Sequence, residues 1–179
     1  MASKMPRATS GSTRCVAALL AAAMVAGAGC GYTVSSVLPA HIKTIAIPTF
    51  ADNTVEHSLA DDVTQGLING FLADRRLRIE RERDADSVLR GTVLAYKNRV
   101  YGYTQQEVAT QYEIVLAVKV VLRDQVKNRD VWKEDEMTVR TTYSVVAVGE
   151  TPAQTEADGR KDAIQKLADQ IVSRTVQGW

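Results

Sequence analysis

The sequence predicts an α+β fold, a two-layer sandwich in which a mixed sheet of about four to five strands is covered on one face by two helices. Five segments alternate apolar and polar residues as strands do, and two others repeat apolar residues at helical spacing. Their predicted order is β-α-β-β-β-β-α. Because one parity of residues 112–122 is entirely apolar, we expect one face of the sheet to lie against the helices.

The first predicted strand covers residues 41–47, which alternate in polarity and end at Pro48, a residue without a backbone donor. A short strand over 77–80 and a longer one over 87–96 follow the first helix. The segments 112–122 and 131–145 are separated by a polar turn, so we expect them to pair as a hairpin.

The first helix is predicted over 54–73, because Asn53 and Glu56 resemble a capping box and apolar residues recur at every fourth position. Gly66 and Gly70 have the spacing of a close-packing pair, which we interpret as a close approach of this helix to the sheet.

The second helix is predicted to begin at residues 151–154, where Thr151 supplies a capping hydroxyl and Pro152 occupies the first helical position. Its apolar stripe continues through Ile164 and Ile171 toward the C-terminus. The two helices together would cover the apolar face of the sheet.

Residues 1–29 resemble a secretory signal peptide: basic residues precede an apolar run over 15–26, and small residues follow it. The run is too short to span a bilayer, which takes roughly 20 apolar residues. We therefore expect three regions: a signal peptide over 1–29, a lipidated tether over 30–40 and one α+β domain over 41–179.

Cys30 follows the small residues at the end of the signal, and no second cysteine remains after cleavage. A lone thiol in an oxidising compartment has no disulfide partner, so we predict that Cys30 carries the lipid anchor. The alternative is cleavage by ordinary signal peptidase, for which the small residues 26–28 are also suitable.

The charge balance argues against a nucleic-acid partner. The chain has 22 Lys and Arg against 21 Asp and Glu, and removal of Lys4, Arg7 and Arg14 with the signal leaves a net charge of −2. His41 and His57 lack the spacing of metal ligands, and no nucleophile motif or phosphate loop is present. We therefore predict no enzyme activity, no metal and no cofactor.

One segment contains aromatic and basic residues but no acid. Between residues 91 and 106, Lys97 and Arg99 lie near Tyr101 and Tyr103, at the predicted turn joining the two longest strands. Such a turn suits an anionic amphiphile or a partner protein. The alternative is an ordinary polar hairpin end.

Taken together, the mature residues resemble the LptE family of lipopolysaccharide-assembly lipoproteins. The resemblance extends over almost the whole mature chain. It rests on Cys30-Gly31-Tyr32, Leu38-Pro39, residues 42–48, Asn53-Thr54, Ala85-Asp86, Leu89, Gly91, Tyr112-Glu113 and the last helix near Trp179. It implies a lipoprotein on the periplasmic side of the outer membrane that plugs an LptD-type β-barrel and helps to insert lipopolysaccharide.

On this resemblance, Lys97, Arg99, Tyr101 and Tyr103 are predicted to contact lipopolysaccharide, with Arg140, Arg160 and Lys161 as the next basic candidates. We expect the chain to be a monomer before it joins its barrel. The alternative function is that of an accessory lipoprotein of the curli-assembly or TolB-like type, acting in secretion or as a synthase activator. Residues 45–54 of this chain are similar to the first strand and loop of those lipoproteins.

Overall fold

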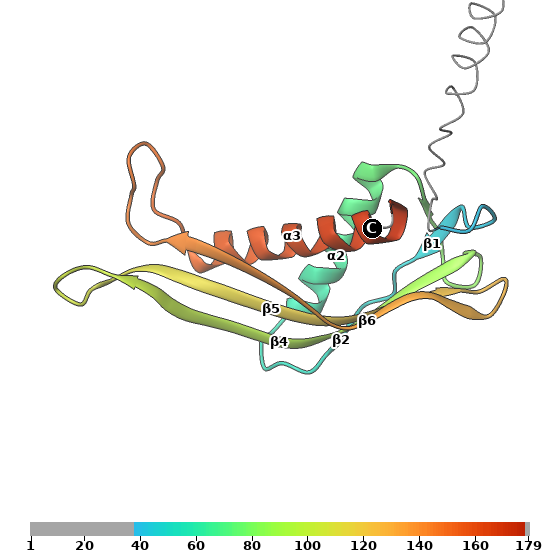
Figure 1. Cartoon of the computed structure of the whole chain (residues 1–179), viewed down its shortest axis with the longest axis horizontal. Coiled ribbons are helices and arrows are strands. Elements are labelled where there is room, and N and C mark those ends of the chain that lie inside the picture. The colour runs from blue at the N-terminus through green and yellow to red at the C-terminus, as the bar shows by residue number, and fades with distance from the viewer. Residues whose placement is uncertain (1–37, 178–179) are drawn as a thin grey trace, which may run out of the picture. The chain divides into compact units, whose positions relative to one another are not determined.

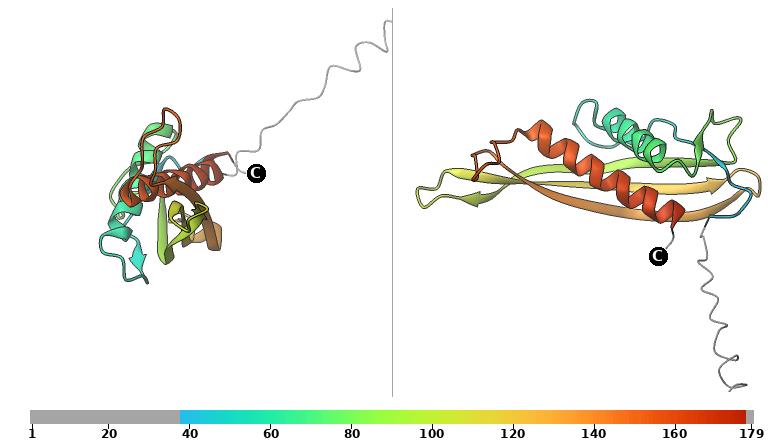
Figure 2. Two further views of the ribbon diagram at one scale, coloured as in Figure 1. Left: turned by 90° about the vertical axis from the view of Figure 1, so that its left-hand side faces the viewer. Right: turned by 90° about the horizontal axis from the view of Figure 1, so that it is seen from above.

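The computed structural model describes residues 38–177, in which two helices cover one face of a mixed six-stranded sheet (Figures 1 and 2). The elements are β1 (Thr44–Ala46), β2 (Ala51–Asp52), α2 (Leu59–Asp74), β3 (Arg78–Ile79), β4 (Ser87–Tyr103), β5 (Ala109–Asp124), β6 (Arg129–Ser144) and α3 (Glu156–Val176). The predicted α+β class and layer arrangement are confirmed. The predicted signal peptide, Cys30, most of the tether and Trp179 lie outside the described residues.

The sheet has the strand order β3-β1-β4-β5-β6, with β2 pairing β4 beyond the end of β1. β1 runs parallel to both β3 and β4, whereas β4, β5 and β6 are antiparallel neighbours. Pro48 lies between β1 and β2, where the chain makes no ladder bond. Three long strands therefore form most of the sheet, and the short N-terminal strands extend one edge of it.

The core lies between the helices and one face of the sheet. Alternate residues of β5 point into it, and Leu116, Val118, Val120 and Leu122 are all fully buried there. The helices contribute their own apolar stripes to the same cluster, which includes Val63, Leu67, Phe71, Leu167, Ala168 and Ile171. The prediction that one parity of β5 is completely buried is confirmed for these residues.

Both helices begin later than the sequence predicts. The carboxylate of Asp52 accepts hydrogen bonds from the backbone N–H and the hydroxyl of Thr54, which holds residues 52–54 in a turn and delays α2 to Leu59. In α3 the capping box is formed by Thr155 and Asp158 instead of Thr151.

Gly66 and Gly70 bring α2 close to α3, not to the sheet as the sequence analysis expected. A Cβ at Gly66 would lie 2.3 Å from Ile164 Cγ2, and a Cβ at Gly70 would lie 3.3 Å from Ala168 Cβ. The pair therefore lets the two helices pack side by side over the same face of the sheet.

Two carboxylates hold the start of the domain against the long strands. Asp86 Oδ2 accepts hydrogen bonds from the backbone N–H groups of Lys43 and Thr44. These N–H groups, that of Lys43 first, lower the pKa of Asp86. The buried Asp124 lies 2.8 Å from His41 Nε2. Its burial raises the pKa, but the N–H of Lys127 and the imidazole of His41 outweigh that effect and leave the pKa below its ordinary value.

We predict that Gly66→Ala destabilises the fold by about 1–3 kcal/mol, because the added methyl group overlaps Ile164. At an exposed helix position the same change would stabilise by up to ~1 kcal/mol. Chemical denaturation of Gly66→Ala, Ile164→Ala and the double variant measures the effect. We expect the double variant to lose less unfolding free energy than the two single variants lose together, because removing the Ile164 side chain makes room for the added methyl group. Losses that simply add would contradict a contact between positions 66 and 164.

We also predict that acid weakens the junction at Asp86 and Asp124. Both folded-state pKa values lie below the unfolded value of about 3.9, so their stabilisation is complete above that pH. It disappears as the pH falls through the folded-state pKa. Urea denaturation between pH 7 and pH 2 should show a smaller loss of unfolding free energy for Asp124→Asn than for the wild type. Equal losses in the two proteins would exclude a contribution from Asp124.

Candidate functional site

The predicted site residues lie on a strand, not in a turn. β4 extends to Tyr103, so Lys97, Arg99 and Tyr101 all lie within it, and the expectation that they form the turn is wrong. The chain reverses after Tyr103, where Glu107 takes a positive φ of 61°. The reason is that residues 97–103 continue to pair with β5, as far as the pair between Tyr103 and Ala109.

The strand register places Lys97 and Arg99 on the sheet face opposite the helices. Lys97 pairs with Val115, and Val115 pairs with Arg140 on β6. Directly opposite residues on antiparallel strands project from the same face, with Cβ atoms about 5 Å apart. Because Leu116 points into the helix-covered core, its neighbour Val115 points away from it. Three strands therefore present Lys97, Val115 and Arg140 side by side on the open face.

A second row lies two residues farther along the same face. Arg99 pairs with Glu113, and Glu113 pairs with Thr142. The side chain of Glu113 is only 10% exposed, and its Oε2 accepts a hydrogen bond from Arg99 Nε at 2.7 Å. The charge of Arg99 is therefore largely balanced by an acid from the neighbouring strand, although residues 91–106 contain none.

The cations of the open face differ in whether an acid neutralises them. Five of them form ion pairs: Arg90 with Glu82, Arg99 with Glu113, Arg123 with Asp130, and both Lys119 and Lys133 with Asp135. Within residues 38–177, neither Lys97 nor Arg140 has such a partner. These two side chains flank Val115 and are the cations of this face best placed to bind an external anion.

The two tyrosines lie farther along β4. Tyr101 is 62% exposed and Tyr103 is 63% exposed, so their rings contact solvent more than they contact the fold. A phenol ring can contact both hydrocarbon and water, which suits the boundary of an amphiphile. We call Lys97, Arg99, Arg140, Tyr101 and Tyr103 the basic strip; it joins three cations to two exposed rings.

Arg160, by contrast, holds α3 to the helix-covered face of the sheet. It lies 3.2 Å from Glu56 and 3.7 Å from Glu156, and its guanidinium is 5.0 Å from the centre of the Tyr96 ring. Burial raises the pKa of Tyr96 to about 12, and the Tyr96 hydroxyl donates a hydrogen bond to Glu156. Of the three alternative basic candidates, only Arg140 joins the basic strip; Arg160 and Lys161 are on α3.

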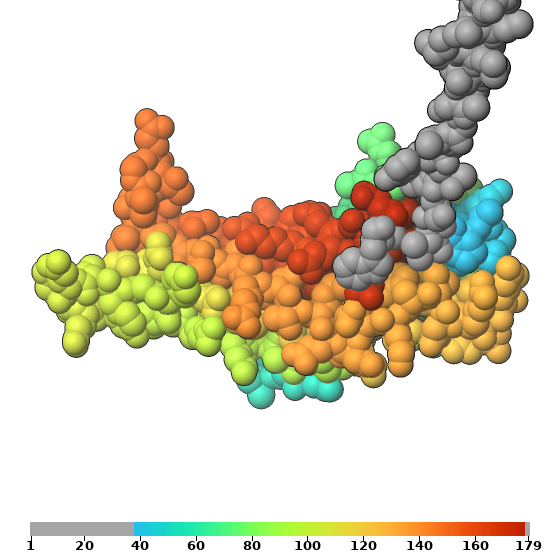
Figure 3. Space-filling model, in the orientation of Figure 1, coloured from blue at the N-terminus to red at the C-terminus, as the bar shows by residue number. Residues whose placement is uncertain are grey.

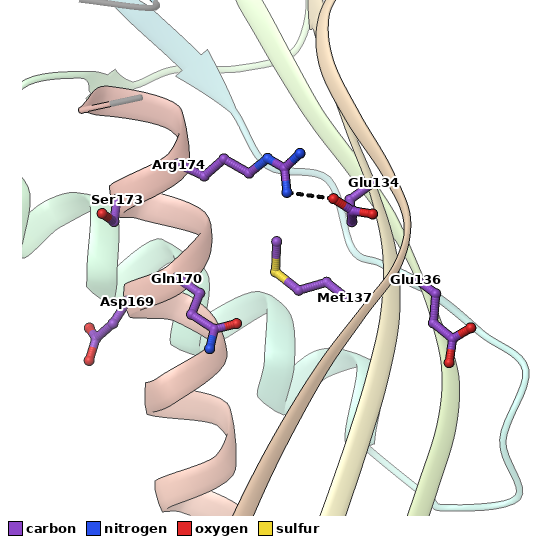
Figure 4. Close-up of a pocket in the computed structure, with 7 residues that line it drawn as sticks. All are labelled: Glu134, Glu136, Met137, Asp169, Gln170, Ser173 and Arg174. Carbon is purple, nitrogen blue, oxygen red and sulfur yellow. Dashed lines mark hydrogen bonds and ion pairs between the residues drawn. The ribbon is translucent and has the colours of Figure 1, made fainter. Parts of the chain in front are cut away.

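The described part of the chain has a groove of about 730 Å³ between β6 and the C-terminal half of α3 (Figure 4). Arg174 crosses it to reach Glu134 at 2.5 Å, and Met137 points into it from β6. A second groove of about 700 Å³ lies on the surface between α2 and α3, beside their contact at Gly66 and Ile164. Neither groove adjoins the basic strip.

Between residues 38 and 177, no three or more His, Cys, Asp or Glu side chains are grouped closely enough to hold a metal ion. None of the helices in this part of the chain is long and apolar enough to cross a membrane. The chemistry of the basic strip is that of binding: it offers fixed cations and aromatic rings to a ligand.

Sequence reasoning missed Glu113 as the partner of Arg99 because the pairing depends on an irregularity in β4. The register shifts between Val93 and Ala95, which changes the face on which residues 95–100 lie; two further shifts follow on either side of Gly102. Polarity alternation on β5 identifies the open face, but the shift in β4 has no comparable signal in the sequence.

The model of the family described as "LptE: Lipopolysaccharide-assembly" matches residues 42–175. Two solved structures with 11% identity show the same fold. Protein XCC0632 from Xanthomonas campestris has a TM-score of 0.55 over 78% of this chain and 86% of its own. The hypothetical protein CT253 from Chlamydia trachomatis has a TM-score of 0.52 over 74% of this chain and 95% of its own.

PelC from Paraburkholderia phytofirmans, described as a dodecamer, shares 19% identity over 75% of this chain and 92% of its own, with a TM-score of 0.49. No curated protein matches the sequence significantly.

We predict that Glu113→Gln strengthens binding of an anion to the basic strip. The change raises the local charge of Lys97, Arg99, Arg140 and Glu113 from +2 to +3. Calorimetric titration with tripolyphosphate at low salt should show about two- to fivefold tighter binding, and the gain should shrink at 0.5 M salt.

The matched control is Glu82→Gln, which frees Arg90 at the opposite end of the same strand. An equal gain in that variant would mean that net charge alone controls the binding, and would contradict a local site.

Proposed function

Because the chain belongs to the LptE family of lipopolysaccharide-assembly proteins, we propose that it is an outer-membrane lipoprotein that assists lipopolysaccharide assembly as the plug of an LptD-type β-barrel. The match over residues 42–175 is the observation that carries this proposal. In this proposed role, the chain binds its ligand and its partner and positions them, and it does not convert a substrate.

The basic strip supports lipopolysaccharide as the ligand. The lipid A part of lipopolysaccharide presents phosphate groups above acyl chains, so a protein that recognises it needs cations next to amphipathic rings. Lys97 and Arg140 offer two cations without acidic partners in the described part of the chain, and Arg99 adds a third that Glu113 partly balances. Tyr101 and Tyr103 would lie at the boundary between phosphates and acyl chains.

The open face of the sheet supports a large partner. Val115 and Val121 are only partly covered there, and charged side chains alternate with them. Such a mixture keeps the free domain soluble and can still be desolvated in a complex, because interfaces combine apolar contacts with polar ones. In the proposed complex the barrel wall covers the part of this face around Val121, and the basic strip stays accessible to lipopolysaccharide.

A lipid on Cys30 would attach the domain to the periplasmic surface of the outer membrane. Seven residues separate Cys30 from Leu38, the first described residue, and the eight Cα–Cα steps between them span at most about 30 Å. Leu38 packs against the core near the β1 end of the domain. The tether therefore keeps that end close to the membrane, and the basic strip lies toward the other end of the long strands.

We predict that Lys97→Glu with Arg140→Glu weakens lipopolysaccharide binding about tenfold or more at low salt. The two changes turn a local charge of +2 into −2, and the effect should diminish as salt screens it. The charge-matched control is Lys127→Glu with Arg129→Glu at the turn between β5 and β6. Wild-type affinity in the basic-strip variant, or an equal loss in the control, would refute the assignment.

We predict that Cys30→Ser releases the chain from the membrane unless the barrel retains it. Two or three acyl chains, at ~0.8 kcal/mol per buried CH₂ group, make a nearly permanent anchor. Metabolic labelling with a fatty-acid analogue followed by membrane fractionation measures both outcomes. Labelling of the variant at the wild-type level would mean that the lipid is attached elsewhere.

A further inference from the structure

The outer edge of β6 has backbone groups without a partner strand. β6 is the last strand of the sheet, and in the described part of the chain only β5 pairs with it. In an antiparallel edge strand, alternate residues point their N–H and C=O groups away from the neighbouring strand. Among residues 38–177, none from Asp130 to Tyr143 forms a backbone–backbone hydrogen bond outside the ladder with β5. Ser144 differs, because its carbonyl accepts a hydrogen bond from Gln154 N at 2.7 Å.

The two halves of this edge differ in how well they are protected against pairing. Before Met137 the register with β5 shifts, and three acids lie at the irregularity: Glu134, Asp135 and Glu136. Irregularities and charged side chains are common means of keeping an edge strand from pairing with another chain.

The second half of the edge lacks such protection. Residues 137–143 pair with β5 without a shift, and their side chains alternate regularly between buried and exposed. They include no acid, glycine or proline, and Arg140 is their only charged residue. We call residues 137–143 the free edge. It has the regular, extended geometry that a further strand needs.

The groove between β6 and α3 lies beside the start of the free edge (Figure 4). Met137, the first residue of the free edge, points into it. Its lining includes three acids against one cation, which gives a net charge of −2: Glu134, Glu136 and Asp169 against Arg174. Arg174 is bonded to Glu134, whereas neither Glu136 nor Asp169 has a cationic partner within residues 38–177. The groove therefore combines an apolar side chain with an excess of negative charge.

These features specify one kind of side chain at one position. An extended segment paired with the free edge would point alternate side chains toward α3. Beside Met137, a Lys or Arg fits the groove, because its aliphatic stem can cover the methionine while its charged head stays near the acids. Farther along the free edge, Lys166 Nζ donates a hydrogen bond to Thr141 Oγ1 at 2.9 Å. A second cation in that place would meet a like charge.

We propose that the free edge binds an extended basic segment of a partner protein as an additional strand of the sheet, with one cation of the segment in the groove beside Met137. Backbone hydrogen bonds would supply the attachment, and the groove would fix the position of the cation. Figure 3 shows the surface of β6 (orange) directly beside that of α3 (red), so an added strand would contact both. This binding requires no ligand at the basic strip.

The test uses a peptide of about seven alternating lysine and valine residues, a length that matches the free edge. It is titrated into the isotope-labelled full chain isolated from the cell envelope. We expect slower hydrogen exchange at every second backbone amide between residues 137 and 143, because only the outward-pointing N–H groups gain a partner. A peptide methylated on the nitrogens of its pairing side should bind about tenfold more weakly or worse, since it cannot donate to the edge.

The groove is tested by Glu136→Gln with Asp169→Asn, which removes its two unpaired negative charges. We expect the lysine–valine peptide to bind about five- to tenfold more weakly at low salt, and a glutamine–valine peptide to bind as it does to the wild type. The charge-matched control is Asp61→Asn with Asp62→Asn in the first turn of α2. Equal losses in the two double variants would overturn the assignment of the cation to the groove.

Three exchange results would overturn the proposal as a whole. Exchange along residues 137–143 that the peptide does not slow would mean that the edge binds no strand. Slowing at β3, on the opposite edge of the sheet, would place the site elsewhere. Slowing of the same amides without peptide, as the concentration of the protein rises, would mean that a second copy of the chain occupies the edge.

Discussion

The close approach of α2 to α3 at Gly66 keeps both helices on the same face of the sheet, and the rest of the structure depends on that arrangement. A side chain at this position would overlap Ile164. With the helices packed side by side, Leu116, Val118 and their neighbours on β5 are buried, although no helix of residues 38–177 covers the opposite face. The fold thus forms a complete core while leaving one sheet face open to solvent.

The open face carries many charged side chains, but they are unevenly balanced by ion pairs. Ion pairs balance Arg90, Lys119 and Arg123. Toward the end of the sheet that lies away from Leu38, Lys97 and Arg140 have no acidic partner in the described part of the chain. At the same end of the sheet, Tyr101, Tyr103 and Val108 of the β4–β5 hairpin are exposed to solvent.

The fold class follows from periodicity alone, because strand and helix spacing survive in the sequence of β5 and α3. The ends of the helices cannot be predicted from periodicity, because several nearby residues could form the turn or cap. The structure uses Asp52 before α2 and Thr155 before α3. Four members of the basic strip were predictable as a set of residue types at 97–103, and Arg140 was only one of three further basic candidates. The geometry of the strip was not predictable, because the register shift after Val93 decides which side chains share a face.

The central claim is that the open side of this domain is a surface for a barrel partner, and co-purification tests it most directly. The tagged full chain would be isolated from detergent-solubilised outer membrane and its companions identified by mass and stoichiometry. We expect one large β-barrel protein per copy of the chain. Isolation of the chain without a barrel, and above all as a stable ring of its own copies, would contradict the account and favour the secretion or synthase-activator alternative.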